Sequence, residues 1–585
     1  MIGAEGFVVL PDVDSAAFSV FSAPEVLRYP SGRPWVMGRD LTSVSCGSIR
    51  VVLVGACPVS TTRLTSLVSR IRCVDDVSAF ARSLPGSVHV VASVGGVVRV
   101  QGSITGLRSV FHAVVAGVPV ASDRADVLAR LLGSSLDDDV LAVRLISVNL
   151  PPPLCDRSVW RGVSAVPADS YLTLDPLRVV RWWTAPEPSL GLAEGAPAVR
   201  DALVAASSTP GRPSADLSGG LDSTSLCFLT RPDLITARLF NGDPANDDPV
   251  FADLACAALP LASHVVVGRD DLPGMFGDLG SVVDPEGPAL NVRTAARNLA
   301  YARLLASRGA RWHLAGHGGD QLFSAPLSYL HTLARGTPFV ALRHLRGYRA
   351  RYRWPLGSSL VALASRRDLV SSWARLADDL TAPRPARSPL VSWLPPLRMP
   401  PWASADAVST ARRVLRSVEV APFAADRGQH GTLANLRTYS HSYRMMARTY
   451  RAGGLSLHLP YFDDRVVEAV LAVRLSERTT PWRYKPLLVE AMQGRVPSGV
   501  LARRTKGEFS VDAHSGLRAN LPSLLSLFAD SGLASRGLID VDVLRSRLVG
   551  AHRDNQNLLA LDATLACEVW LRVVSGRSES KLVTL

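Results

Sequence analysis

A glycine turn with the sequence Ser218-Gly219-Gly220-Leu221-Asp222-Ser223 follows the apolar run Ala215-Asp216-Leu217. It leads into Thr224-Ser225-Leu226-Cys227-Phe228-Leu229, and this order predicts a strand, a tight turn and a helix. Two glycines let the backbone bend sharply with its N–H groups pointing inward, and the helix adds the positive end of its dipole. A turn of this kind binds phosphate.

The side chains of the turn suit the same ligand. Ser218 and Ser223 can donate their hydroxyls to phosphate oxygens, and Asp222 offers a carboxylate oxygen of the kind that magnesium prefers. The Walker pattern is excluded because no Gly-Lys-Ser/Thr follows. A Gly-Gly turn alone is common in loops, but the complete string between a strand and a helix favours a nucleotide site.

The string resembles the pyrophosphate loop of ATP pyrophosphatases that form AMP-activated carboxylates. A second segment, Ala315-Gly316-His317-Gly318-Gly319-Asp320-Gln321-Leu322-Phe323, is similar to the second signature of the asparagine synthetase group, although Gln321 replaces the usual acidic residue. The resemblance implies ATP and Mg²⁺ as cofactors, with Asp222 and Asp320 as the metal ligands. It also implies contacts to the adenine from Leu217, Phe240, Ala315 and Gly316.

The chain around these motifs alternates between the two kinds of element. Helices are predicted over 197–207, from 222, over 250–259 and over 293–307, and strands up to 217 and over 235–240, 264–267 and 312–315. This alternation predicts an α/β domain with a doubly wound parallel sheet. Ligands of such sheets lie beyond the carboxyl ends of the strands, so we expect both glycine-rich segments to form one site.

Residues 1–190 have a different pattern of many short strands and few helices. Strands are predicted over 7–10, 48–54 and 88–94, the last continuing through Gly95-Gly96 into 97–100 as a hairpin, and helices over 74–84 and 125–132. The order resembles the Ntn-type (α+β) glutamine amidotransferase domain that precedes the synthetase domain in asparagine synthetases. Segments 163–172 and 179–183 resemble its last hairpin. Residues 192–197 are interpreted as a linker to a synthetase-like domain over 197–585.

Position 2 departs from that family. Its glutaminases use the cysteine exposed after removal of the initiator Met, whereas this chain has Ile2, and no other cysteine lies near the N-terminus. An alkyl side chain cannot act as a nucleophile. The glutaminase-like domain is therefore predicted to produce no ammonia and to serve as a scaffold or a partner surface.

Two later segments add candidate residues through the resemblance. Residues 450–463 are similar to the family's Gly-x-Glu-x-Arg-x-Pro-Phe-x-Asp segment, with Ser456 at the Glu and His458 at the Arg. Residues 503–510 resemble the Arg-x-Lys segment, which implies a catalytic role for Lys506 at the ATP phosphates. Lys485 is a second candidate phosphate contact.

Composition narrows the functional classes. The 585 residues carry a net charge of +13, and the seven cysteines include no Cys-x-x-Cys pair, which argues against a disulfide scaffold and a zinc site. No uninterrupted apolar segment long enough to span a membrane and no basic-then-apolar N-terminus is present, so we expect a cytoplasmic protein. No nucleic-acid-binding signature accompanies the charge. An Arg-rich segment over about 325–430 includes Arg343, Arg346 and Arg349, spaced to share a helix face; it is either solvated surface or a docking surface.

The resemblance implies an ATP-dependent ligase. Adenylation of a carboxylate gives it a good leaving group, AMP, and an amine then forms an amide. Because Ile2 excludes ammonia from glutamine, the hypothesis is a lasso peptide cyclase, which joins an Asp or Glu side chain of a leader-free core peptide to its N-terminal amine as a macrolactam. Expected partners are the precursor peptide, a leader peptidase and a leader-recognition protein. The alternatives are a β-lactam synthetase-like enzyme acting on a small amino acid and a scaffold without turnover.

Overall fold

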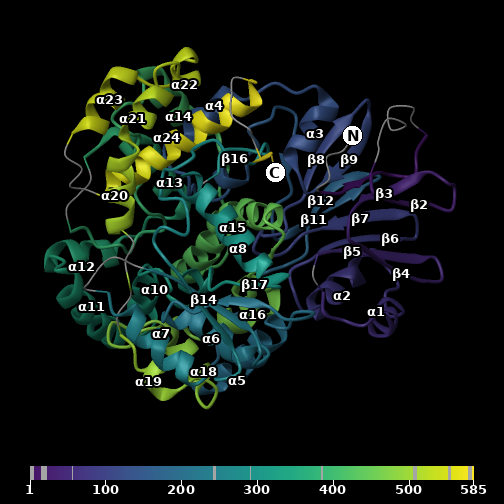
Figure 1. Ribbon diagram of the computed structural model, residues 1–585, viewed down its shortest axis with the longest axis horizontal. Helices are drawn as coiled ribbons and strands as arrows, with labels where there is room; N and C mark the ends of the chain where they lie inside the picture. The colour runs from purple at the N-terminus through teal and green to yellow at the C-terminus, as the bar shows by residue number, and fades with distance from the viewer. Residues whose placement is uncertain are drawn as a thin grey trace.

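The computed structural model has a mixed α/β fold, with the N-terminal strands gathered on one side of the molecule (Figure 1). Ile2 and Lys506 lie outside the residues that the structure describes. The described residues are 6–14, 23–55, 57–240, 246–289, 291–383, 387–504, 507, 510–550, 555–576 and 583–584.

The N-terminal part contains two antiparallel sheets of six strands, in the orders β10-β8-β9-β1-β3-β2 and β12-β11-β7-β6-β5-β4. Trp35 and Val36 from the first sheet and Val52, Val91 and Leu172 from the second belong to one buried apolar cluster, so the sheets pack face to face. The strands of the first sheet are β1 (Val8–Val9), β2 (Glu25–Arg28), β3 (Pro34–Gly38), β8 (Phe111–Val115), β9 (Val118–Ser122) and β10 (Ser164–Ala165). Those of the second are β4 (Leu41–Cys46), β5 (Ile49–Val54), β6 (His89–Val94), β7 (Val97–Gln101), β11 (Ser170–Leu174) and β12 (Leu177–Arg181).

Helices cover the outer face of each sheet. Helix α3 (Ala125–Leu132) packs on the first sheet, and α1 (Thr61–Val68) and α2 (Val77–Ser83) pack on the second. Valine-rich alternation explains the strands, because β-branched side chains suit a surface that is buried on one face. The result is a four-layer arrangement of helix, sheet, sheet and helix.

Two expectations about this part have different outcomes. The β6–β7 hairpin is confirmed: Val94 pairs with Val97, and Gly95 and Gly96 both have positive φ, as a type I′ turn requires. The predicted last hairpin is only half right. Strand β11 pairs with β12, whereas Ser164–Ala165 pairs with β8 in the other sheet.

The segment interpreted as a linker is helical instead, which corrects the prediction. Helix α5 runs from Leu192 to Ala206, so residues 192–197 form its start. The Glu194 carboxylate accepts a hydrogen bond of 2.7 Å from the Gly191 backbone N–H, which caps the helix. The glycine and proline of this segment suggested a flexible connection, but the cap and the packing of α5 stabilise a helix there.

The second part is built on five parallel strands in the order β15-β14-β13-β17-β18. The order reverses between the central strand β13 and its neighbour β17, and a crevice for ligands forms at such a point in a parallel sheet. Apolar clusters fill both faces of the sheet. The strands are β13 (Ser214–Asp216), β14 (Ile235–Leu239), β15 (Ser263–Val267), β17 (Trp312–Leu314) and β18 (Ser456–His458).

Several helices position the site. Helices α6 (Leu221–Leu229), α7 (Asp248–Ala257) and α8 (Ala295–Ser307) alternate with the strands, and α9 (Gly319–Phe323) follows β17. The Arg-rich segment contains α10 (Tyr329–Gly336), α11 (Pro338–Tyr352), α12 (Leu356–Ala364) and α13 (Leu369–Asp378). Helix α14 (Ala405–Ser417) precedes α15, and α18 (Pro486–Met492) follows Lys485. The C-terminal helices are α20 (Ser510–Ala519), α21 (Leu521–Leu527), α22 (Gly532–Ser535), α23 (Val541–Val549) and α24 (Asn555–Val574).

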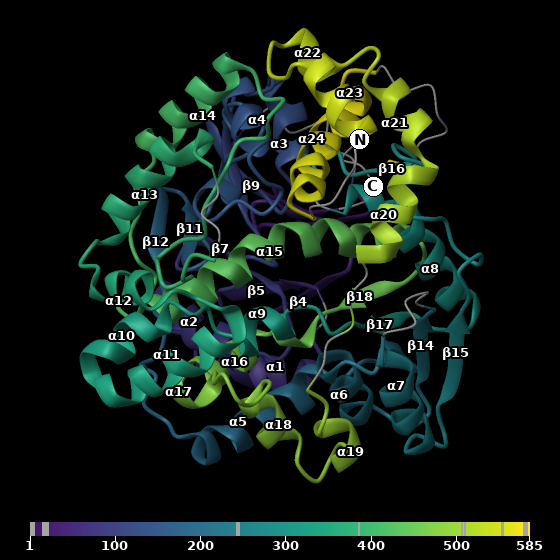
Figure 2. The same cartoon turned by 90° about the vertical axis from the view of Figure 1, so that its left-hand side faces the viewer.

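Helix α15 (Arg427–Ala452) crosses the centre of the molecule, in front of strands of the N-terminal sheets in Figure 2. Its Ser440 hydroxyl donates a 2.6 Å hydrogen bond to the Thr105 carbonyl of the N-terminal part. Met446 and Tyr450 belong to the apolar cluster beneath the parallel sheet. Among the described residues, no helix combines the length and the apolar character needed to cross a bilayer.

The Leu226→Ala substitution tests whether α6 is held by its buried face. Leu226 is fully buried, so we expect a loss of about 2–5 kcal/mol in the free energy of unfolding, measured by chemical denaturation. The matched control is Leu254→Ala on α7, where the side chain is 48% exposed and the loss should stay below about 1 kcal/mol. Equal losses in the two variants would contradict this packing.

Candidate functional site

The first glycine turn connects β13 to α6. Gly219 has φ +82°, and a Cβ there would overlap the Asp248 carbonyl oxygen and lie 2.9 Å from the Ala252 nitrogen. The hydroxyl oxygens of Ser218 and Ser223 lie 2.8 Å apart, so both side chains reach the same point. The turn, the two hydroxyls and the start of α6 thus form a compact cradle for an anion.

The second turn follows β17 and packs directly on the first. A Cβ at Gly316 would lie 2.6 Å from the Ser223 nitrogen, and one at Gly319 would overlap the Asp222 carboxylate. The Tyr461 hydroxyl donates a 2.9 Å hydrogen bond to the Asp222 carbonyl from the side. The structure therefore brings the two predicted motifs together at the point where the strand order reverses.

Lys485 joins the two motifs electrostatically. Its ammonium pairs with the Asp222 carboxylate and lies 2.7 Å from Asp320 Oδ1. Burial by itself would lower the pKa of Lys485, but the two carboxylates outweigh burial and raise it, so the side chain is a cation. Its backbone φ of +43° lies in the left-handed region directly before Pro486 and α18.

The residues implied for the adenine lie at the carboxyl ends of three adjacent strands. Leu217 follows β13, Phe240 follows β14, and Ala315 and Gly316 follow β17. Leu217 and Ala315 are buried, whereas the Phe240 side chain is 52% exposed and free to pack on a ligand. Ser456 is not at this end: it pairs with Trp312 at the start of β18, so its contribution to a substrate pocket is not supported by the geometry.

Two carboxylates from different motifs are a partial set of magnesium ligands. Among the described residues, no group of three or more His, Cys, Asp or Glu side chains is placed to hold a metal ion. Magnesium is usually bound by one or two carboxylates together with phosphate oxygens of the substrate, so Asp222 and Asp320 fit Mg²⁺ that is shared with a nucleotide. Lys485 would keep part of their charge neutralised.

Described residues on both sides of Lys506 lie beside the first turn. Arg503 lies 2.6 Å from carboxylate oxygens of both Asp247 and Asp248, and Gly507 packs against the Asp248 side chain. Because Asp248 also contacts Gly219, residues on both sides of Lys506 are anchored next to the cradle.

Sequence reasoning missed several of these contacts. Asp247 and Asp248 give no local signal because acidic residues are common at the start of a helix, and only the fold places them against Arg503. The ring of Tyr443 on α15 stacks on His317 with centroids 4.7 Å apart. Tyr461 lies in the 450–463 segment that resembles the family, so that resemblance could have identified Tyr461 as a residue near the site.

A model of the asparagine synthase family matches residues 196–572. The chain belongs to the asparagine synthase family. Members of this family form amide bonds with the consumption of ATP, which agrees with a cradle for phosphate at the switch in strand order. The match covers the parallel sheet, both glycine turns, Lys485 and α15.

Two solved structures show a distant similarity. One is glutamine phosphoribosylpyrophosphate amidotransferase from B. subtilis complexed with ADP and GMP, at 11% identity, covering 56% of this chain and 77% of that chain with a TM-score of 0.20. The other, described as the allosteric regulatory enzyme of purine biosynthesis, has 11% identity, 54% and 74% coverage and a TM-score of 0.20. With TM-scores this low, neither carries an argument about this chain. None of the curated proteins compared matches it.

The Gly219→Ala substitution tests the cradle. The added methyl group would meet the α7 backbone, so we expect ATP binding, followed by calorimetry, to fall below detection. Gly309→Ala is the matched control, because Gly309 has a similar φ of +88° with open space around its Cβ position. That variant bears the backbone cost of about 1 kcal/mol but should bind ATP normally. Normal binding by Gly219→Ala would refute the cradle.

Proposed function

We propose that this chain is a lasso peptide cyclase, which adenylates an Asp or Glu side chain of a leader-free peptide and joins it to the N-terminal amine. The observation that carries the nucleotide half of the proposal is the junction of two glycine turns through Asp222, Asp320 and Lys485. The family supports ATP-dependent amide formation. The family does not specify the substrate, and the proposal of a peptide rests on the following features.

Ile2 removes the nucleophile that would supply ammonia, so the amine must come from elsewhere. An amine within the substrate itself satisfies this requirement. The Arg-rich helix α11 lies beside the segment that leads to Lys485, since Gly347 packs on Pro481 and the Arg343 guanidinium lies 4.8 Å from the centre of the Trp482 ring. A basic, partly exposed surface next to the site suits a substrate of peptide size better than a small amino acid.

The reaction divides between this chain's groups. The peptide carboxylate attacks the α-phosphate of ATP, and pyrophosphate leaves into the amides and hydroxyls of residues 218–223. Bound Mg²⁺ would supply charge neutralisation at the phosphates through Asp222 and Asp320. Lys506 is proposed to stabilise the charge that develops there, and Lys485 to contribute a second positive charge. The N-terminal amine then attacks the mixed anhydride, AMP leaves, and the peptide has lost one water.

The proposed partners follow from the substrate. A leader peptidase must expose the N-terminal amine, and a leader-recognition protein would deliver the precursor. The N-terminal part, without its own nucleophile, is a candidate surface for either of them.

Asp320→Asn tests the metal assignment. Loss of one ligand charge should lower the rate of ATP–pyrophosphate exchange by about 10²–10³-fold, while thermal unfolding changes little. EDTA should abolish exchange by the native protein, and excess Mg²⁺ should restore it. The control is Asp253→Asn on α7, where the carboxylate is exposed and pairs with Arg238 away from the turns. Retained exchange in Asp320→Asn would remove the metal role.

Mass spectrometry tests the product. A candidate leader-free peptide incubated with the protein, the peptidase, ATP and Mg²⁺ should lose 18 Da, the mass of one water, as AMP forms, and glutamine should not be hydrolysed. AMP formed with a small carboxylated amino acid, without a change in the peptide, would transfer the assignment to a β-lactam synthetase-like enzyme. Glutamine hydrolysis would contradict the argument from Ile2.

A further inference from the structure

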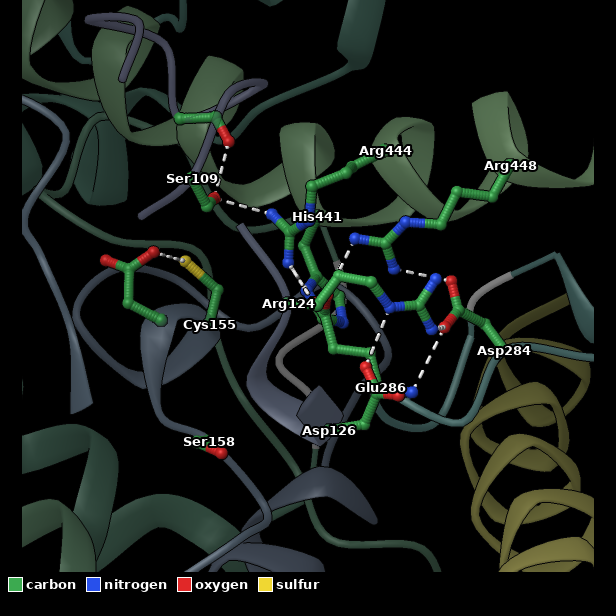
Figure 3. A network of polar contacts seen from close by, with 12 residues as sticks. Ser109, Arg124, Asp126, Cys155, Ser158, Asp284, Glu286, His441, Arg444 and Arg448 are labelled. Atoms are coloured by element: carbon green, nitrogen blue, oxygen red, sulfur yellow. Dashed lines mark hydrogen bonds and ion pairs between the residues drawn. The ribbon is translucent and has the colours of Figure 1, made fainter. Parts of the chain in front are cut away.

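A second polar cluster lies on the face of α15 that is turned away from the glycine turns. Arg437, His441 and Arg444 recur every three or four residues and so share one face of the helix. Tyr443 points to the opposite side, where it stacks on His317. Figure 3 shows Arg444 directed towards Ser109 of the N-terminal part, with a second contact to His441.

These side chains line a small inner cavity of about 30 Å³ between α15 and the N-terminal part. Its polar lining has more cations than carboxylates. The negative charge of Glu286 is neutralised by Arg444 and by Arg448, whose Nη2 lies 2.7 Å from Glu286 Oε2. Burial would raise the pKa of Glu286, but these arginines lower the pKa well below its usual range. Burial raises the pKa of Asp156, the other acid. The charged lining residues are Arg108, Arg144, Arg157, Arg437, Arg444, Asp156 and Glu286.

Several buried donors on side chains that line this cavity have no hydrogen-bond acceptor among the described residues. They include the buried Nε atoms of Arg144 and Arg444, and Arg437 Nη2, which lies 3.6 Å from Asp169 Oδ2 and forms no hydrogen bond. An N–H group buried without an acceptor destabilises the folded protein. Three such groups on residues that line one cavity favour a ligand that accepts hydrogen bonds.

His441 adds a fourth donor. Its Nδ1 lies 3.2 Å from Arg444 Nη2, and because a guanidinium can only donate, Nδ1 is the acceptor. Burial and the nearby Arg144 and Arg444 lower the pKa of His441 well below its usual value, so the ring is neutral. Its proton is therefore on Nε2, which is also buried without an acceptor among the described residues.

A larger outer chamber of about 600 Å³ adjoins the inner cavity. Its walls include Trp160 from the N-terminal part, Leu369 and Trp373 from α13, and Phe423 before α15. This outer chamber offers apolar surface to the side chains of a ligand, and it leads to the arginine-lined inner cavity. The two cavities share seven lining residues: Asp156, Arg157, Ser158, Ala165, Pro167, Ser170 and Arg437.

We propose that the two cavities form one binding site for the carboxyl-terminal end of a peptide. The terminal carboxylate occupies the inner cavity, where it accepts hydrogen bonds from Arg144, Arg437, His441 and Arg444, and the preceding apolar side chain occupies the outer chamber. A cavity needs about 10–15 Å³ to hold one water, so a volume of about 30 Å³ has room for about two oxygen atoms. A carboxylate has two oxygen atoms. That the ligand is a peptide rests on the proposed function; recognition of a carboxylate does not.

The test compares an acid with its amide on the full-length protein. N-acetylphenylalanine, N-acetylphenylalaninamide and sodium acetate are titrated by calorimetry without ATP at constant ionic strength. We expect the acid to bind at least about tenfold more tightly than the amide, because the amide has neither the charge nor two acceptors. Acetate should bind at least about tenfold more weakly than the acid, since it leaves the outer chamber unfilled. Equal binding of acid and amide would overturn the proposal, and acetate as tight as the acid would overturn the peptide assignment in favour of a small free acid.

Variants connect the discrimination to the cavity. Arg437→Met keeps an unbranched apolar side chain beside Phe423 but removes the guanidinium, which lies 4.1 Å from the centre of the Phe423 ring. The variant should lose most of the preference for the acid while it still binds the amide. Arg413→Met is the control, because Arg413 pairs with Asp139 at 2.9 Å and lines neither cavity. If circular dichroism shows Arg437→Met to be unfolded, His441→Phe replaces it, because this variant removes the proposed Nε2 donor without removing a charge. Undiminished preference in the folded variant contradicts the proposal. A protein that discriminates acid from amide but shows no ATP–pyrophosphate exchange would refute the proposed function alone.

Discussion

The site depends on the contact between two backbone turns that only glycine allows. Gly219 lets the first turn lie against α7, and Gly316 and Gly319 let the second lie against Ser223 and Asp222. Because these glycines have no side chains, the two backbones lie in contact. Asp222 and Asp320, about a hundred positions apart in the chain, therefore both reach the ammonium of Lys485. The parallel sheet places both turns at its carboxyl edge, and the glycines allow the two turns to come into contact.

Local sequence patterns predicted the parts of the fold that depend on local chemistry. The strand, turn and helix around residues 218–223 and the Gly95-Gly96 hairpin follow from glycine conformation and hydrophobic alternation, and the structure confirms them. The start of α5 at Leu192 was misread because Gly195 and Pro197 favour a loop in isolation, whereas a capping carboxylate and tertiary packing favour the helix.

Contacts between distant segments left little signal in the sequence. Lys485 was expected to contact phosphate, but its position between Asp222 and Asp320 follows from how α18 meets the sheet. Arg503 pairs with Asp247 and Asp248 through an arrangement that no spacing rule contains. The cationic face of α15 was not predicted from the sequence, because its significance depends on the N-terminal surface opposite it.

Helix α15 has 26 residues, which corresponds to a rod of about 39 Å. One of its faces is covered by the N-terminal part and the other by the parallel sheet, so neither half can be removed without exposing a long row of buried side chains to water. The N-terminal part is thus the second wall of a shared core, and we expect the two parts to fold and unfold together.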